Sequence, residues 1–232
     1  MIILKFLRRI YVEFAAFFLW LLSIIINKTI KREVYGEENI ENVHKSGKNV
    51  IFCFWHNASH PCFYYYRNKK LCIIPINRIY GEVLARFAQK YKISSELLNI
   101  DGTPAERTET VIKLLKRLKS GYDIGIAVDG PPNEKLYDVK AGPLYIASKS
   151  RMPILPAGMY AKRGFTMWWR WDKYIIPLPF TKVVINLGKP IHIPKKLNAK
   201  DAEKQCKELG EKIHALTREA KEICLGAGGG EG

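Results

Sequence analysis

Apolar positions along the chain fall into short continuous runs that alternate with stretches of helical spacing. Residues 50–55, 71–76, 124–128, 154–159 and 183–187 are almost wholly apolar, which is typical of strands covered on both faces. Residues 82–91 and 103–119 lie between such runs and carry apolar positions three and four residues apart. This alternation predicts an α/β fold with a mixed, largely parallel central sheet flanked by helices.

The helix over residues 103–119 has the clearest boundaries. Thr103 and Glu106 match a capping box, Pro104 takes the first helical position, and Gly121 ends the helix. The residues expected on its apolar face are Val111, Leu114, Leu115 and Leu118. A second, charged amphipathic helix is expected over residues 199–224, where it closes the domain.

The first part of the chain holds the longest apolar run, residues 10–26, interrupted by Glu13 and Ser23. Basic residues flank it: Lys5, Arg8 and Arg9 before, Lys28, Lys31 and Arg32 after. A spanning helix needs about 20 apolar residues, so this run favours an interfacial or half-inserted anchor whose basic ends meet anionic headgroups. A cleaved signal peptide competes, although no A-x-A site follows. A buried core helix would leave the flanking charges unexplained.

These patterns divide the chain into three parts. Residues 1–32 form the predicted membrane anchor, with spanning and interfacial arrangements both open, and residues 33–225 form the domain that contains the predicted sheet. Residues 33–49 are polar, contain Gly36 and Gly47, and predict a loop. The glycine-rich residues 226–232 predict a disordered tail.

Composition narrows the class of protein. The net charge of +16, from 38 basic and 22 acidic residues, indicates an anionic partner, either nucleic acid or anionic lipid. The apolar first segment favours lipid. The five cysteines contain no CxxC pair, so reduced thiols are expected rather than a disulfide framework or a zinc ribbon.

Trp55 and His56 come at the end of the first strand, where the carboxyl edge of an open α/β sheet collects ligands. An imidazole there can take a proton from an alcohol, although a hydrogen-bonded structural histidine fits the position equally well. His60 lies four residues after His56, a spacing at which two histidines on one helix face can bind a metal. However, no Glu follows His56 as it does in the HExxH zinc motif, and Pro61 disfavours helical geometry at His60. No metal site is predicted.

Two loops carry further candidate chemistry. Asp129, Gly130 and Pro131 follow another strand, where the carboxylate could orient His56 or bind an acceptor, or simply form a turn. Residues 101–103 (Asp101, Gly102 and Thr103) lead into a helix whose free N–H groups favour phosphate, and Arg107 lies one turn further on.

An aromatic and basic segment covers residues 163–174. It contains Trp168, Trp169 and Trp171 among Arg163, Arg170 and Lys173. Tryptophan and basic side chains both favour the membrane interface. Stacking of nucleic-acid bases and an aromatic corner of the core are the alternatives.

Taken in order, these motifs resemble the lysophospholipid acyltransferase superfamily, and more closely a bacterial branch related to the lipid A late acyltransferases. The matching segments are WH at 55–56, NRIYGEVLARF at 77–87, SGYDIGIAVDGPP at 120–132, VKAGPLYIASKSRMPILPAGM at 139–159 and WDKYIIPLPFTKVVINLGKPI at 171–191. The resemblance implies an acyltransferase at the cytoplasmic face of the inner membrane. Its implied partners are anionic lipid, a lipid acceptor and the co-substrate acyl-CoA or acyl carrier protein, with no other cofactor and no nucleic acid.

The resemblance also implies residue roles. In the superfamily a histidine deprotonates the acceptor hydroxyl, which attacks the thioester without an acyl-enzyme, and an acid five positions later accompanies that histidine. His56 matches the histidine, whereas position 61 is Pro61. We therefore expect Asp129, or else Glu82, to supply the carboxylate. Asp129 also occupies the place of an acceptor-binding Glu-Gly-Thr-Arg motif, which would assign it to the acceptor instead.

The substrate-binding residues expected on this basis are Trp55, Asp101, Gly102, Thr103, Arg107, Gly130 and Pro131. Two other functions remain as alternatives. The missing acid at position 61 would suit a non-catalytic lipid-binding protein on the same scaffold, and the basic charge would suit a nucleic-acid-binding protein.

Overall fold

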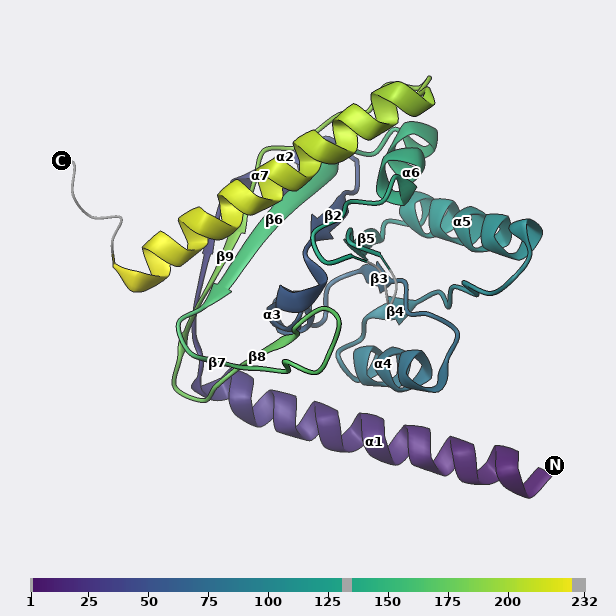
Figure 1. Ribbon diagram of the computed structural model, residues 1–232, viewed down its shortest axis with the longest axis vertical. Coiled ribbons are helices and arrows are strands. Elements are labelled where there is room, and N and C mark those ends of the chain that lie inside the picture. The colour runs from purple at the N-terminus through teal and green to yellow at the C-terminus, as the bar shows by residue number, and fades with distance from the viewer. Residues whose placement is uncertain (1, 131–134, 227–232) are drawn as a thin grey trace.

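The computed structural model describes residues 2–130 and 135–226. A seven-stranded sheet lies at its centre, in the order β1-β9-β6-β2-β5-β3-β4 (Figure 1). The strands are β1 (Lys31–Tyr35), β2 (Ile51–Phe54), β3 (Leu71–Ile73), β4 (Ser94–Ser95), β5 (Asp123–Ala127), β6 (Ile154–Ala161) and β9 (Lys182–Leu187). The central strand β2 pairs in parallel with β5 and β6, whereas β6 and β9 are antiparallel. The predicted mixed, largely parallel sheet is confirmed.

Helices cover both faces of this sheet. They are α1 (Ile2–Thr29), α2 (Glu37–Lys45), α3 (His60–Tyr65), α4 (Ile79–Lys90), α5 (Pro104–Lys119), α6 (Gly142–Ser150) and α7 (Ala199–Leu225), with a short 3₁₀ helix η1 (His56–Ala58) after β2. Figure 1 shows α7 along β6, while α1 passes beside α4 at the opposite end of the molecule. A small antiparallel hairpin, β7 (Gly164–Thr166) and β8 (Ile175–Pro177), stands apart from the main sheet.

The continuous apolar runs are explained by two hydrophobic clusters, one on each face. Phe52 and Phe54 of β2 pack with side chains of α1, α2, α3 and α4. The alternate residues Ile51 and Cys53 pack with α5, α6 and α7. Because successive side chains of a strand point to opposite faces, a strand covered on both sides must be apolar at every position.

The prediction of a loop over residues 33–49 is wrong, because this segment contains β1 and α2. The polar edge strand β1 is stabilised by pairing in parallel with β9. Glu33 of β1 forms an ion pair with Lys182 of β9, with 2.8 Å between Oε2 and Nζ. In α2, Ile40 and Val43 are buried three residues apart, and Gly36 makes the left-handed turn before the helix with φ 75°. The predicted boundary at residue 32 therefore falls inside a strand.

Other predicted helix ends are close to the observed ones. The capping box of α5 is confirmed, since Glu106 N–H donates to Thr103 Oγ1 and the Glu106 carboxylate accepts from Thr103 N–H at 2.7 Å. The helix predicted over residues 199–224 is α7, which ends at Gly226 with φ 80°. The prediction of a disordered tail falls mainly on residues 227–232, which lie outside the described residues.

Helix α1 packs along one side and is bare along the other. Val12 and Ala16 are buried against the core, and Arg8 and Glu13 form ion pairs with Glu82 and Arg86 of α4. The exposed apolar residues of α1 include Phe6, Phe14, Phe18, Leu22 and Ile25. Within residues 2–130 and 135–226, α1 is the helix that is long and apolar enough to cross a membrane, with 28% of its most apolar window buried.

Buried polar contacts fix the second half of α1 onto the domain. Ser23 Oγ accepts a hydrogen bond from the Tyr91 hydroxyl at 2.9 Å, and Asn27 Nδ2 donates to Ser23 O at 2.8 Å. Ser23 also lies 3.4 Å from Nε2 of His60 on α3. Buried polar groups are costly unless paired, so these contacts favour one position of α1 on the domain.

A half-buried ion pair joins α2 to the start of β5. Asp123 accepts from His44 Nε2 at 3.0 Å and from the Val50 N–H at 2.9 Å. Hydrogen bonding to Asp123 raises the pKa of His44 above its ordinary value, against an opposing effect of burial. The folded protein therefore binds the imidazolium proton more tightly than the unfolded chain does.

We expect His44→Gln to lower the free energy of unfolding at about pH 5.5 and to change it much less at about pH 9. The contribution of a raised pKa is fully present below the unfolded value and is lost as the pH rises through the folded value. Because His44 is 44% exposed, the loss should be no more than about 1 kcal/mol. Urea unfolding at the two pH values measures it. Equal losses at both would show that His44 acts by packing and not by charge.

Candidate active site

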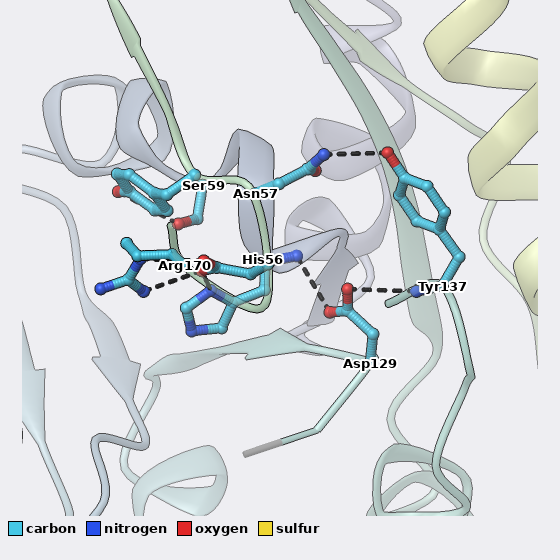
Figure 2. A network of polar contacts seen from close by, with 8 residues as sticks. His56, Asn57, Ser59, Asp129, Tyr137 and Arg170 are labelled. Carbon is cyan, nitrogen blue, oxygen red and sulfur yellow. Dashed lines mark hydrogen bonds and ion pairs between the residues drawn. The ribbon is translucent and has the colours of Figure 1, made fainter. Parts of the chain in front are cut away.

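The sheet places His56 at the carboxyl end of β2. Strand β5 pairs with β2 in parallel, with Ala127 opposite Phe54, so the residues after both strands emerge at the same edge. Asp129 follows β5 there, and its Oδ1 accepts the backbone N–H of His56 at 3.0 Å (Figure 2). Asp129 therefore lies next to His56 but contacts its backbone, and the role expected of Asp129 depends on what the ring contacts.

The imidazole ring of His56 meets a different acid. Its Nδ1 lies 2.6 Å from Oδ2 of Asp172, which is completely buried and belongs to the loop between β7 and β8. Arg170 donates to both oxygens of the same carboxylate, from Nε and from one terminal nitrogen, each at 2.8 Å. Figure 2 shows Arg170 beside the His56 ring, on the side away from Asp129. The Asp172 carboxylate thus binds the imidazole of His56 and the guanidinium of Arg170 together.

The electrostatics of Asp172 keep it ionised. Burial pushes the pKa of Asp172 up, but the hydrogen bonds from His56 and Arg170 outweigh burial and hold that pKa well below its ordinary value. An ionised carboxylate only accepts hydrogen bonds, so Nδ1 of His56 must carry the proton in this contact. The lone pair of the neutral ring is then on Nε2, and the side chain is 29% exposed. This tautomer can take a proton from a bound hydroxyl.

The prediction that Asp129 or Glu82 supplies the acid for the ring is therefore wrong. Asp129 is fully buried and contacts the backbone of His56 and, at 3.5 Å, the N–H of Tyr137. Burial raises the pKa of Asp129, and the N–H of His56 offsets part of this rise. Glu82 instead pairs with Arg8 of α1 at 2.6 Å. Asp129 positions the loop, and Glu82 connects two helices.

Sequence reasoning missed Asp172, although two signals pointed to it. It is the single acid in residues 163–174, a segment otherwise aromatic and basic, and it is the second residue of one of the segments that carry the family resemblance. At position 61 the acid expected by that resemblance is replaced by Pro61, which lies in the first turn of α3. In this chain the acid that contacts the histidine lies on a separate hairpin, 116 residues further along the sequence.

Aromatic and hydroxyl side chains surround the His56 ring. The ring centroids of Trp171 and Tyr174 lie 5.4 and 6.2 Å from that of His56. Ser59 donates to the Tyr174 hydroxyl at 3.3 Å, and Figure 2 shows Asn57 donating to the Tyr137 hydroxyl at 2.9 Å. These contacts tie η1 to both flanking loops and limit rotation of the imidazole.

The predicted substrate-binding residues are spread over three places. Trp55 is 2% exposed and packs against the rings of Tyr137 and His214. Its side chain therefore has almost no surface left for a substrate, and the expectation that it contacts one is wrong. Gly130, with φ 88°, makes the turn after Asp129. Pro131 lies outside the described residues.

The loop that begins with Asp101 forms a separate surface. Asp101 pairs with Arg78 at 2.9 Å, Gly102 N–H donates to Asn99 O, and Thr103 is held in the capping box. Arg107 is exposed. A phosphate at this helix end would have to displace the Glu106 carboxylate, and phosphate binding here stays a prediction.

His60 does not share a site with His56. It is buried on α3 and faces Ser23 of α1, whereas His56 faces Asp172. Burial, followed by the charge of Arg32, lowers the pKa of His60 to about 4, so this histidine is neutral near pH 7. A metal would need more ligands, and residues 2–130 and 135–226 contain no cluster of three or more His, Cys, Asp or Glu side chains suited to one.

Among the comparisons with known proteins, the one with solved structures shows the fold. No protein-family model matches the chain. An uncharacterized protein of Rickettsia prowazekii (strain Madrid E) is 26% identical over 199 residues, which cover 84% of this chain and 88% of that protein. The crystal structure of the 1-acyl-sn-glycerophosphate (LPA) acyltransferase PlsC from Thermotoga maritima superimposes with a TM-score of 0.54 and 18% identity, covering 94% of this chain and 80% of that one. The chain therefore has the fold of this acyltransferase.

We expect the Nδ1 proton of His56 to give a strongly downfield NMR resonance, since it is shared in a short, charge-assisted hydrogen bond with Asp172. Asp172→Asn should abolish this resonance. Asp129→Asn keeps an oxygen to accept the backbone N–H of His56 and should retain it. Loss of the signal in the Asp129 variant alone would mean that Asp129, and not Asp172, holds the ring.

Proposed function

We propose that this protein is an acyltransferase that moves a fatty acyl group from acyl-CoA or acyl carrier protein to a hydroxyl of a lysophospholipid-like acceptor, with His56 as the general base. The observation that carries the proposal is the 2.6 Å contact between His56 Nδ1 and the buried Asp172. It leaves Nε2 as the basic atom at the carboxyl edge of a sheet with an acyltransferase fold.

The chemistry follows from this geometry. The acceptor hydroxyl gives its proton to Nε2 of His56 while its oxygen attacks the thioester carbonyl carbon. The imidazolium that forms is stabilised by the adjacent Asp172 carboxylate, which Arg170 keeps ionised. When the tetrahedral intermediate collapses, the carbon–sulfur bond breaks and the thiolate takes the proton back from Nε2. The products are an ester and a free thiol, and no acyl-enzyme forms.

Arg170 and Asp129 act as positioning residues in this scheme. Arg170 offsets the cost of a buried carboxylate by holding it with two charge-assisted hydrogen bonds. Asp129 fixes the backbone at His56, so that the ring leaves β2 in one direction. Exposed Arg107, near the ion pair of Arg78 and Asp101, is the candidate for contact with an anionic headgroup.

We further propose that α1 lies in the plane of the membrane interface, at the cytoplasmic face. A spanning helix would be surrounded by lipid over its whole apolar length, but α1 contacts the domain from Arg8 to Asn27. Its opposite side is apolar and exposed, which suits burial among headgroups and the ends of acyl chains. The net charge of +16 favours an anionic membrane.

Replacing His56 with alanine should lower kcat/KM for acyl transfer by about 10²–10⁴-fold, the usual contribution of a general base. Asp172→Asn should cost a comparable factor because the ring loses its orientation. The matched control is Glu82→Gln, which removes an acid outside the site and should retain nearly full activity. The assay uses labelled acyl-CoA or acyl carrier protein with lysophospholipid acceptors, and thermal unfolding checks that each variant is folded.

Two results would contradict the proposal. Equal transfer by wild type and His56→Ala would remove His56 from the mechanism. Binding of lipid without turnover, across all donors tested, would favour the non-catalytic lipid-binding protein.

The orientation of α1 predicts the accessibility of its ends. In a Cys206→Ser background, whose remaining cysteines are buried, Lys5→Cys and Lys31→Cys should both react with a membrane-impermeant maleimide from the same side of the membrane. Inside-out and right-side-out vesicles distinguish the two sides. Reaction of the two positions from opposite sides would show that α1 spans the bilayer.

A further inference from the structure

The hairpin that supplies Asp172 also carries large apolar side chains in solvent. Trp168 and Trp169 in its connecting loop are 71% and 72% exposed, and Phe180 just after the hairpin is 77% exposed. Phe165 adds to this group, with its ring 5.9 Å from that of Trp169. Single exposed apolar residues are common on protein surfaces, but several large aromatic ones on one short hairpin indicate a binding surface.

The loop between β7 and β8 exposes Trp168 and Trp169 to solvent and buries Asp172. Its backbone is closed by hydrogen bonds from Met167 N–H to Tyr174 O at 2.9 Å and from Arg170 N–H to Met167 O at 3.1 Å. Lys173 adopts a left-handed conformation with φ 47°, a strained state for a non-glycine residue. A loop fixed in this way does not collapse its indoles onto the protein, so they remain exposed for a partner.

This hairpin is joined to the end of α1. The Phe180 N–H donates to Thr29 Oγ1, the last residue of α1, at 3.1 Å. Ile176 of β8 packs against Ile26 and Ile30 at the same end. Figure 1 shows the hairpin directly beside this end of the helix. The hairpin that carries the exposed aromatic residues is therefore fixed to the end of α1.

The charges beside the tryptophans fit an anionic lipid surface. Lys173 Nζ lies 5.9 Å from the Trp168 ring centre, and Arg163 at the root of the hairpin is exposed. Tryptophan and basic side chains both favour the headgroup layer of a membrane, where the apolar part of each is buried and the polar part stays hydrated. The attachment of the hairpin to α1, which itself exposes large apolar side chains, favours a membrane over a soluble protein partner.

We propose that Trp168, Trp169 and Phe180 form a second membrane-contact site, which inserts into the interface of an anionic bilayer beside α1. The site rests on the in-plane position proposed for α1, and it deepens the proposed function. Asp172 is three residues from Trp169, so the hairpin that enters the bilayer also holds the partner of His56. The histidine is thereby placed at the membrane surface, where a lipid acceptor lies.

The test uses full-length protein with Trp20→Phe, which removes the indole of α1. Vesicles of phosphatidylcholine and phosphatidylglycerol with brominated acyl chains should quench its tryptophan fluorescence, because bromine quenches only at contact. Adding Trp168→Phe and Trp169→Phe should abolish most of this quenching. Flotation of the protein with vesicles that leaves its fluorescence unquenched would overturn the proposal, and so would a protein that does not float.

Affinity gives a second measurement. Trp168→Ser with Trp169→Ser should weaken binding to the same vesicles by at least roughly tenfold, since two indoles leave the interface. The matched control is Tyr145→Ser, an exposed aromatic residue on α6, which should bind as the parent does. An unchanged affinity of the double variant would contradict the proposal. Quenching by a monomeric brominated lysolipid that is lost in the Trp168→Phe, Trp169→Phe variant would instead assign these two tryptophans to a single acyl chain and overturn it.

These readouts are independent of turnover. Quenching without any acyl transfer would refute the proposed enzyme and leave the membrane-contact site supported. Acyl transfer to dispersed acceptors without quenching would support the enzyme and refute the site.

Discussion

The site depends on one hydrogen bond, between the Nδ1 proton of His56 and the carboxylate of Asp172. A buried carboxylate is costly, and here the guanidinium of Arg170 offsets that cost by binding both oxygens. The hydrogen bond sets both the tautomer and the direction of the ring, and the proposed general base needs both. The sheet provides the histidine and the hairpin provides the acid, so the chemistry requires both parts in their final places.

Much of the fold could be predicted from the sequence, because it is encoded locally. Each continuous apolar run became a buried strand, and the Thr103–Glu106 capping box began a helix as expected. His56 could also be predicted, since the end of a buried strand at the carboxyl edge of a sheet is a property of neighbouring residues. Strand β1 was missed because its polar residues are stabilised by partners on β9, such as Lys182, that no local pattern indicates.

Asp172 was missed for the same reason as β1, because its partner is distant in the sequence. Asp172 is 116 residues from His56, and its segment looks locally like an exposed or core aromatic corner. Asp129 was the natural choice because it follows a neighbouring strand, and it did reach His56, but through the backbone and not the ring. Strand order fixes which loops meet at the edge of the sheet. Which side chain of those loops reaches the imidazole depends on the tertiary path of the hairpin, which spacing does not contain.

The position of Pro61 has a consequence for how the molecule matures. Where an acid lies one turn after the histidine, a short peptide already holds both partners and a half-made chain can pair them. Here the segment bearing His56 is synthesised early, but its partner arrives only after more than a hundred further residues have been synthesised and the hairpin has closed. A nascent or partly unfolded chain therefore possesses the imidazole without the carboxylate, and the proposed pair of base and acid is complete only when the fold is.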